Sequence, residues 1–502
     1  MNLYRLFERQ ARHQPAKSAL ADHQRSLSFG ALDLAAGRHA AALMRRGVRP
    51  GDRVGVILKE HADHIALNLA ILRLGAAFAV IDWRAPPAER QAIGDTLGIA
   101  AALLEPQMPR LGIAAALLEP QMPPLEGIAS LAIDEAFHRT AAALEPASVH
   151  AAEPGDAAMI ALSSGTTGFP KGAIITHDQA FHRFVAGTMA FGWRAEDRYL
   201  ACMAFCFSAG RDYPLHALLS GASVIVAPTL FTASDYVEMV GRHGITASLL
   251  SPTPLRWLLG EAGGKAPLLP GVRRLAVSGA PLHTEEKAAI YRRVAPGLIE
   301  TLGTSATGAL TRLAGEDLVT RADSAGRLLP LSEIEIVDRA GRTLPRGAEG
   351  ILRVRGPGTS TAMIGDNAGD GPATLREDGW FYPGDIVHLD EEGFLRLKGR
   401  SAELIIRGGA NVYPAEIEKL LLTHPAVADA AVVGWPSAEL GEEVAAFVTA
   451  RSPVEAASLK QFCREHLAAY KVPRAFILVP DLPRTSTGKV RKTELAAQLT
   501  PL

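Results

Sequence analysis

The segment RVGVILKEHADHIALNLAILRLGAAFAVID, residues 53–82, joins two short apolar runs through a helical period. RVGVIL (53–58) and FAVID (78–82) each contain a short apolar run of the kind that forms a buried strand. Between them, over 61–75, apolar residues recur every three or four positions, as on one face of a helix. A strand, a helix and a second strand in this order indicate a parallel sheet with helices packed on it.

The same pattern continues to about residue 325 and then changes. MIALSS (159–164) and RRLAVSG (273–279) fit further strands of parallel sheets. After residue 325, EIEIVD, GRTL, GILRVRG and IVHLDEEGFLRLKGR indicate short alternating strands, with DEEG (390–393) as a hairpin connection. These strands predict a small antiparallel β-subdomain.

The last hundred residues return to mixed α/β character. We expect helices over 414–422 and 458–469 and strands over 429–434 and 445–450. The expected fold is therefore α/β. A large N-terminal domain, residues 1–400, would contain layered α/β subdomains and the small β-subdomain. A short polar hinge would join it to a small mobile α+β domain, residues 401–502.

Composition excludes several classes of protein. The 502 residues are 48% hydrophobic and 21% charged, which is ordinary for a globular chain. The formal net charge is −1, so nothing favours nucleic acid or an anionic membrane as a partner. Three cysteines cannot form a disulfide scaffold. The uncharged run 213–234 contains Pro and Gly and fits a helix, a turn and a strand better than a membrane span, and the N-terminus resembles no signal peptide. We expect a cytoplasmic protein without membrane insertion.

The strongest chemical signal is SSGTTGFPKG, residues 163–172, directly after the strand MIAL. Glycines allow backbone N–H groups to approach an anion, and hydroxyl groups add further donors. Lys171 supplies a positive charge. The spacing is not that of a Walker A loop, so composition alone leaves a flexible Gly/Ser loop as the alternative.

The order of residues in this loop resembles the phosphate loop of the adenylate-forming superfamily, which includes acyl-CoA synthetases, aryl-CoA ligases and adenylation domains. Further segments are similar in the expected order. They are SGAPL (278–282), GWFYPGDIVHLDEEGFLRLKGR (379–400), GGANVYPAEIE (408–418), YKVPR (470–474) and PRTSTGKVRK (483–492). Together they span nearly the whole chain.

The resemblance implies a role for each matching position. Lys489 would be the catalytic lysine, between the substrate carboxylate and the α-phosphate of ATP. The implied contacts with ATP phosphates are Ser163, Ser164, Gly165, Thr166, Thr167, Gly168, Lys171 and Ser305. Those with adenine and ribose are Gly279, Ala280, Pro281, Leu302, Gly303, Asp385 and Arg400. The acyl pocket would include Phe205, Phe207, Arg211 and Thr304, and Gly408 and Gly409 would line the thiol tunnel. A turn-forming Asp385, a hinge-side ion pair of Arg400 and a solvent-facing Arg211 remain alternatives.

Several positions depart from the pattern of the resembling families. Leu302 replaces a tyrosine, Ala306 replaces the glutamate that usually helps to hold Mg²⁺, and Ala402 replaces an Asp or Lys at the hinge. Alanine cannot coordinate a metal, so the metal ligand is left unknown. Glu300 and Asp212 are candidate substitutes, although each also fits a structural acid.

The implied reaction is ATP-dependent conversion of a carboxylic acid into an acyl-adenylate, followed by thioester formation, with ATP, Mg²⁺ and coenzyme A as the cofactors. An aromatic or medium-chain acid is the preferred substrate. One alternative is a stand-alone adenylation enzyme that loads a carrier protein with an unusual or β-amino acid. Another is a depleted ligase that only binds nucleotide or acyl ligands.

Two remaining features have ordinary explanations. His61 and His64 lie three residues apart with no third ligand in view, so the histidines predict no metal site. LGIAAALLEPQMP occurs at 97–109 and again at 111–123. Two copies do not make a repeat architecture, and we interpret them as a duplication that lengthened a surface connection.

Overall fold

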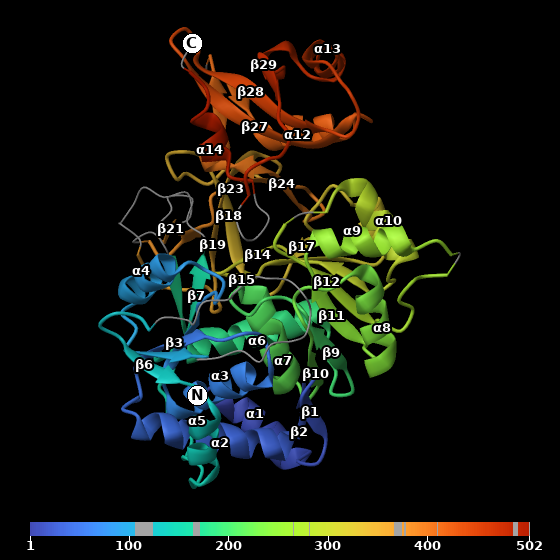
Figure 1. Cartoon of the computed structure of the whole chain (residues 1–502). Helices are drawn as coiled ribbons and strands as arrows, with labels where there is room; N and C mark the ends of the chain where they lie inside the picture. Colours follow the sequence, from blue (N-terminus) through green and yellow to red (C-terminus); the bar gives the residue numbers. More distant parts are fainter. Residues whose placement is uncertain are drawn as a thin grey trace. The chain divides into compact units, whose positions relative to one another are not determined.

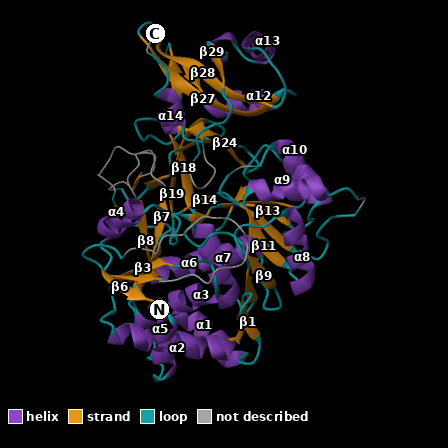
Figure 2. Cartoon of the chain, viewed as in Figure 1, coloured by secondary structure: helices purple, strands orange, loops and turns teal. Residues whose placement is uncertain are grey.

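The computed structural model describes residues 1–105, 124–163, 171–264, 266–280, 282–365, 374–375, 378–408, 410–484 and 490–500. It divides into two compact units. Unit 1 comprises Met1–Ile334, Val354–Phe381 and Gly393–Leu395, and unit 2 comprises Glu335–Arg353, Tyr382–Glu392 and Arg396–Leu502. The predicted α/β class is confirmed (Figures 1 and 2). The predicted boundary at residue 400 remains a prediction.

A seven-stranded sheet of unit 1 contains the first predicted strands. Its order is β20 (Ala362–Ile364), β8 (Lys171–Thr176), β7 (Ala157–Ser163), β4 (Ala77–Val80), β3 (Arg53–Ile57), β5 (Ala101–Leu104) and β6 (Ala129–Ala132). From β7 to β6 neighbouring strands are parallel, whereas β8 and β20 run antiparallel to their neighbours. The first copy of the 13-residue repeat supplies buried β5, and the second copy, residues 111–123, lies outside the described residues.

The second sheet of unit 1 has nine strands. Its order is β17 (Arg327–Leu328), β16 (Thr311–Ala314), β13 (Leu298–Glu300), β12 (Arg274–Val277), β11 (Ala247–Leu250), β9 (Arg198–Ala201), β10 (Ser223–Val226), β1 (Ser18–Ala21) and β2 (Ser26–Ser28). The strands from β13 to β1 are parallel. A short hairpin of β14 (Gly303–Thr304) and β15 (Gly308–Ala309) follows β13.

Helices cover these sheets, as the βαβ pattern predicts (Figure 2). They are α1 (Tyr4–His13), α2 (Phe29–Arg45), α3 (Ala62–Leu74), α4 (Pro87–Leu97), α5 (Glu135–Ala142), α6 (His177–Phe191), α7 (Ser208–Leu219), α8 (Ala233–His243), α9 (Pro252–Glu261), α10 (Thr284–Arg293) and α11 (Asp317–Thr320). Every residue of α3 except Asp63 is buried. A helix that is buried on nearly every side must pack on several elements, and α3 packs on α2, β3 and β4.

The predicted antiparallel strands after residue 325 form a six-stranded sheet. Its order is β21 (Thr374–Leu375), β22 (Phe381–Tyr382), β19 (Glu349–Arg355), β23 (Asp385–Leu389) and β24 (Leu395–Arg400), with β18 (Glu333–Val337) also paired to β19. DEEG connects β23 to its neighbour β24, as predicted. The predicted strand GRTL is wrong, because Gly341 turns the chain with φ +79° and only an isolated bridge from Thr343 to Val337 remains.

The C-terminal part of unit 2 contains the predicted helices and strands. Its sheet has the order β26 (Ala410–Val412), β25 (Ile405–Arg407), β28 (Gly441–Ala450) and β27 (Val427–Ser437), and β29 (Ala475–Leu478) pairs with β28. The helices are α12 (Pro414–Leu422), α13 (Ala456–His466) and α14 (Lys492–Ala496), with short 3₁₀ turns η1 (Ser401–Glu403) and η2 (Ala469–Lys471). Apolar faces of α12, α13, β27 and β28 form one core cluster.

The three cysteines, Cys202, Cys206 and Cys463, are all free, and Cys202 and Cys463 are buried. Among the described residues, no helix combines the length and apolar character needed to cross a bilayer.

Candidate active site

The Gly-rich loop connects two antiparallel strands of the seven-stranded sheet. Ser163, the last residue of β7, is paired directly with Lys171, the first residue of β8. Lys171 is buried, with 9% of its surface exposed. The loop itself, which carries Ser164, Gly165, Thr166, Thr167 and Gly168, lies outside the described residues. The contacts of these residues with phosphates therefore stay a prediction. The pairing of Ser163 with Lys171 fixes the two ends of the loop.

Ser305 lies beside the end of β7, far from it in sequence. Its hydroxyl donates to the Leu162 carbonyl over 2.9 Å and accepts from the Ser208 hydroxyl over 3.1 Å. Ser208 is the first residue of α7. Three segments that the sequence assigns to the site, at residues 162, 208 and 305, are thus joined by hydrogen bonds.

The hairpin that presents Ser305 is unusually tight. Gly303 pairs with Ala309, and a Cβ atom at Gly303 would lie 2.3 Å from the Gly308 carbonyl oxygen. The Thr304 hydroxyl accepts from the backbone N–H groups of Ala306 and Thr307, each over 3.2 Å. Thr304 therefore caps the turn. The sequence predicted Thr304 as an acyl-pocket residue and did not predict this capping role. Leu302, just before the hairpin, is half-buried.

Arg183 anchors this turn, and sequence reasoning missed it. From α6, its guanidinium donates to the carbonyls of Gly358 over 2.7 Å, Ser305 over 3.0 Å and Ala306. The Ala306 carbonyl also accepts from the Ser360 N–H over 2.7 Å. Burial lowers the pKa of Arg183 to about 10, so the side chain remains a cation at neutral pH. The Ala306 methyl group belongs to the apolar core, with 3% exposed.

The two candidate substitutes for the missing glutamate are both engaged in ion pairs. Glu300 is buried, lies 2.6 Å from Lys287 Nζ and accepts from the Leu282 N–H over 3.2 Å. Burial raises the pKa of Glu300, and Lys287 opposes that effect. Asp212 accepts from Arg211 Nε over 2.8 Å. The structure thus favours structural roles for both acids.

The segment after β12 is exposed where the adenine contacts are expected. Gly279 has φ +94°, a left-handed conformation that favours glycine, and Ala280 is exposed as well. Pro281 lies outside the described residues. The turn leaves a backbone edge at the carboxyl end of a parallel strand, where α/β proteins commonly bind ligands.

The expected acyl-pocket residues lie on both sides of the start of α7. Phe205 is 1% exposed and packs edge-on against His64, with ring centroids 5.1 Å apart. Phe207 immediately precedes α7 and is half-buried. The solvent-facing alternative for Arg211 is wrong, because only 4% of the residue is exposed.

Arg211 lines a cavity of about 20 Å³, together with Asn68, Phe205 and apolar neighbours. Its Nη2 atom and Asn68 Oδ1 are both buried without a hydrogen-bond partner in the described part of the chain. A cavity of this size accommodates about one water molecule, and two unpartnered polar atoms supply hydrogen bonds for it. The guanidinium of Arg211 therefore offers an unused N–H donor next to Phe205, within the described part of the chain.

Asp385 and Arg400 meet within unit 2. Arg400 Nε is 2.9 Å from Asp385 Oδ1, and Arg400 Nη1 donates to the Pro383 carbonyl over 2.8 Å. Asp385 is 5% exposed, whereas 42% of the Arg400 side chain is exposed. The ion pair, which was the alternative interpretation of Arg400, is present, and it orients the buried carboxylate expected to contact ribose.

The C-terminal loops hold the remaining predicted residues. Gly408 has φ +56° and donates its N–H to the Leu440 carbonyl over 2.9 Å, whereas Gly409 and Lys489 lie outside the described residues. The segment that carries Lys489 is bounded by a bridge between Arg484 and Val490. Three residues after Lys489, the ammonium of Lys492 lies 2.5 Å from Glu403 and 2.8 Å from Glu418.

Comparison with known proteins gives matches along nearly the whole chain. The profile of the AMP-binding enzyme family matches residues 7–362, and that of the AMP-binding enzyme C-terminal domain matches residues 416–489. The chain is 30% identical to an indoleacetate–CoA ligase of Aromatoleum aromaticum, over 99% of this chain and 98% of that protein. It is 28% identical to a 2-succinylbenzoate–CoA ligase of Bacillus licheniformis, over 96% and 97% of the two chains.

Solved structures agree with these matches. The o-succinylbenzoate CoA synthetase of Bacillus subtilis, in complex with an acyl-adenylate intermediate, superposes with a TM-score of 0.85 at 26% identity, over 98% of this chain and 97% of that chain. The same synthetase in complex with ATP and magnesium ion gives 0.84 at 26% identity, over 98% of each chain.

Proposed function

The chain belongs to the AMP-binding enzyme family, and from that premise we propose that it is an AMP-forming acid–thiol ligase with the residue roles set out below. It activates a carboxylic acid with ATP to an acyl-adenylate and then transfers the acyl group to coenzyme A. The observation that carries the residue roles is the hydrogen bond from Ser305 to Leu162, which places a hydroxyl at the root of the Gly-rich loop.

The ATP phosphates would lie between this loop and the Ser305 turn. Lys171 stands at the loop's far end, paired with Ser163, and Arg183 fixes the carbonyls of Ser305 and Ala306 behind it. Lys489 would act during adenylation, because a carboxylate that attacks a polyphosphate brings like charges together. One ammonium placed between the two groups offsets that repulsion as the bond forms.

Near Ala306, the described side chains offer few free oxygen atoms that could coordinate a magnesium ion. Ala306 offers no side-chain oxygen, and the nearby acids Glu300 and Asp212 are already paired with Lys287 and Arg211. Mg²⁺ often keeps several waters and is held through one or two carboxylates together with substrate phosphates. We infer that the triphosphate and water supply most of its ligands in this enzyme.

For the substrate we propose an aromatic carboxylic acid with a second polar group. Phe205 and Phe207 make the expected pocket apolar, and the unpartnered Nη2 of buried Arg211 can donate to an oxygen of the substrate. The relatives named for indoleacetate and 2-succinylbenzoate act on aromatic acids, and the second of these acids carries an additional carboxylate.

The test is ATP–pyrophosphate exchange over a panel of acids, followed by thioester formation with coenzyme A or with carrier proteins. The proposal expects exchange with arylacetic or arylated dicarboxylic acids and thioester formation with coenzyme A. Arg211→Met should raise KM for acids that carry the second polar group and leave those without it nearly unchanged. Thioester formation only on a carrier protein would support the loading enzyme instead. No exchange with any acid would support a depleted ligase.

We place the enzyme in the cytoplasm. Its three cysteines are all free, which suits a reducing compartment.

A further inference from the structure

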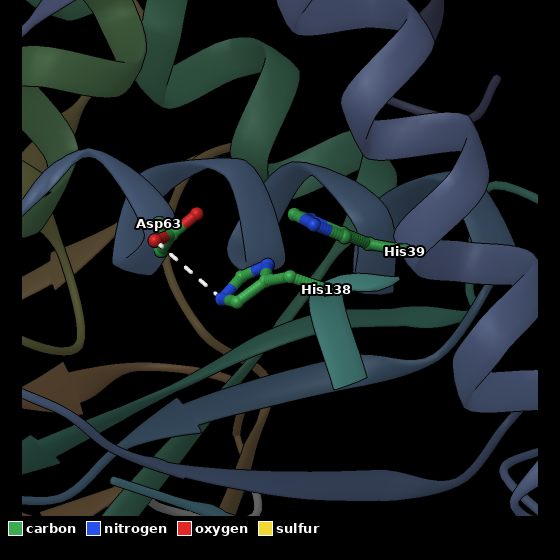
Figure 3. A group of neighbouring side chains, drawn as sticks. All are labelled: His39, Asp63 and His138. Atoms are coloured by element: carbon green, nitrogen blue, oxygen red, sulfur yellow. Dashed lines mark ion pairs between the residues drawn. The ribbon is translucent and has the colours of Figure 1, made fainter. Parts of the chain in front are cut away.

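Three side chains that commonly ligate metals converge from three helices of unit 1. His39 comes from α2, Asp63 from the first turn of α3 and His138 from α5 (Figure 3). One ligand atom from each lies within 4.8 Å of the other two. His138 Nε2 is 3.7 Å from Asp63 Oδ2, and the two imidazole centroids are 5.4 Å apart. None of the three belongs to the expected active site.

The distances between the three ligand atoms are close to those found around a bound metal ion. Three atoms within 4.8 Å of one another share a point that is within about 2.8 Å of each. Bonds from zinc to imidazole nitrogen or carboxylate oxygen are about 2.0–2.2 Å long, so each atom would need to move by less than about 1 Å. Small side-chain rotations supply such a movement without a change in the helices.

His39 gives a second, independent reason to expect a ligand. The residue is 6% exposed, and its Nδ1 has no hydrogen-bond partner in the described part of the chain. Buried polar atoms in proteins are almost always partnered, so an orphaned nitrogen needs an explanation.

The surroundings of Asp63 suit a ligand role as well. Arg25 pairs with Oδ1 of Asp63, and Oδ2 is the oxygen that faces His138. Partners of this kind orient a ligating carboxylate and leave its other oxygen available. Phe137 packs against His39, with ring centroids 5.5 Å apart, and limits access from that side.

We propose that His39, Asp63 and His138 bind one Zn²⁺ ion, with water as the fourth ligand. Two imidazoles and one carboxylate suit zinc better than magnesium, which prefers oxygen ligands alone. The ion joins α2, α3 and α5, which already pack on one another through α2, and so stabilises unit 1. Sequence reasoning missed the site because its ligands are 24 and 75 residues apart, on separate helices.

Zinc binding is measured on the full chain after removal of metal by a chelator and dialysis. Wild type should bind one zinc per chain at micromolar free zinc, and Co²⁺ in its place should give the visible absorption of a tetrahedral site. His138→Ala should weaken zinc binding at least tenfold. The matched control is His182→Ala, because His182 also lies 3.7 Å from an aspartate, Asp178, and is similarly exposed.

Thermal unfolding gives a second readout, since a ligand that binds only the folded chain raises Tm with its concentration. Zinc should raise Tm of wild type and of His182→Ala, but not of His138→Ala. Asp63→Asn, which preserves shape, serves if His138→Ala does not fold. The proposal is overturned if wild type takes up no zinc at micromolar concentration, or if both site variants bind it as wild type does. Adenylation by His138→Ala should stay at the wild-type rate.

Discussion

Ala306 occupies the position where the resembling enzymes carry a metal-binding glutamate. Its methyl group is packed in the core and its carbonyl accepts hydrogen bonds from Arg183 and Ser360. We expect wild type to require Mg²⁺ at an unusually high concentration for half-maximal pyrophosphate release, because water and phosphates must complete the shell. Saturation at low Mg²⁺ would show that another ligand has replaced the glutamate.

Ala306→Glu tests the same position from the other direction. The added carboxylate should lower the Mg²⁺ concentration needed for half-maximal activity. It should also lower Tm, because a charged side chain enters a site that now holds a buried methyl group. The Mg²⁺ titration is therefore paired with a thermal melt, and Ala306→Gln is the control that adds the bulk without the charge. An equal gain from Ala306→Gln would contradict a metal-ligand role.

Arg183→Met should reduce both stability and adenylation. The carbonyls of Gly358 and Ser305 lose this donor, and the Ala306 carbonyl keeps only the Ser360 N–H. An acceptor that is buried and left unsatisfied costs about 1–3 kcal/mol. With the Ser305 turn no longer fixed, KM for ATP should rise as well. The measurements are Tm and pyrophosphate exchange as a function of ATP. Arg183→Lys should recover only part of the stability, because one ammonium cannot replace the several fixed N–H donors of the guanidinium. Unchanged KM for ATP in a folded Arg183→Met variant would limit Arg183 to a structural role.

Single residues were predictable where a motif names them and not where their partners are distant. The sequence pointed to Lys171 and Ser305 because each lies in a recognisable stretch, and their roles toward the phosphates remain predictions. Arg183 could not, because its acceptors at 305, 306 and 358 belong to a different part of the chain. The ion pair of Glu300 with Lys287 could not be predicted either, since the sequence pattern does not show which acidic residue lies beside a lysine in the fold.

At the scale of elements, the strands of the parallel sheets and the existence of helix α3 were predicted, but the extent of its burial was not. Continuous apolar runs are a direct consequence of burial on both faces of a sheet. The period over 61–75 indicated one buried face, whereas the structure buries every residue of α3 except Asp63. GRTL failed because a turn glycine at 341 outweighed the alternation of its neighbours. The hairpin of β14 and β15 was not predicted at all, since strands of two residues leave no periodic signal.

Gly303→Ala should disrupt that hairpin. A Cβ atom there would lie 2.3 Å from the Gly308 carbonyl oxygen, which is backbone and cannot rotate away. The displaced strand would carry Ser305 from Leu162, so we expect a large loss of adenylation with a modest fall in Tm. Gly241→Ala is a suitable control, because no described atom lies within 4 Å of its added Cβ and it belongs to helix α8. Full activity in Gly303→Ala would contradict the proposed role of the turn.

At the scale of the whole molecule, Lys489→Ala separates the two half-reactions. It should lower adenylate formation by roughly 10²–10³-fold, as is typical when one preorganised charge-stabilising donor is removed. Thioester formation from a supplied acyl-adenylate should change much less, because Lys489 is proposed to act during adenylation. Equal losses in both steps would contradict this assignment. Lys460→Ala is a control, since among the described residues its ammonium donates to the Arg474 carbonyl, away from the segment that carries Lys489.

The stability of unit 1 should fall in mild acid. Burial lowers the pKa of His177 and His216 to about 4 and that of His64 to about 3. The unfolded chain, with histidine pKa near 6.5, binds more protons in this range. The stabilisation is therefore complete above pH 6.5 and is lost as pH falls towards 4, by up to about 1.4 kcal/mol per pH unit for each histidine. The raised pKa of Glu300 acts in the opposite direction.

Tm measured between pH 7 and 5 checks this expectation. His177 Nδ1 accepts from the Leu3 N–H over 3.1 Å, so its protonation would break a buried hydrogen bond. His177→Asn keeps an acceptor without a titrating group and should reduce the pH dependence. A Tm independent of pH over this range would show that these histidines do not control acid stability.

The three free cysteines have a practical consequence. Burial raises the pKa of the Cys202 and Cys206 thiols to about 12 and that of Cys463 to about 11. Only thiolates attack electrophiles at an appreciable rate, so at pH 8 the folded enzyme presents almost no nucleophilic sulfur. A colorimetric thiol reagent added to aliquots withdrawn from the reaction can therefore measure the coenzyme A that remains, with little contribution from the enzyme's own thiols while the chain stays folded.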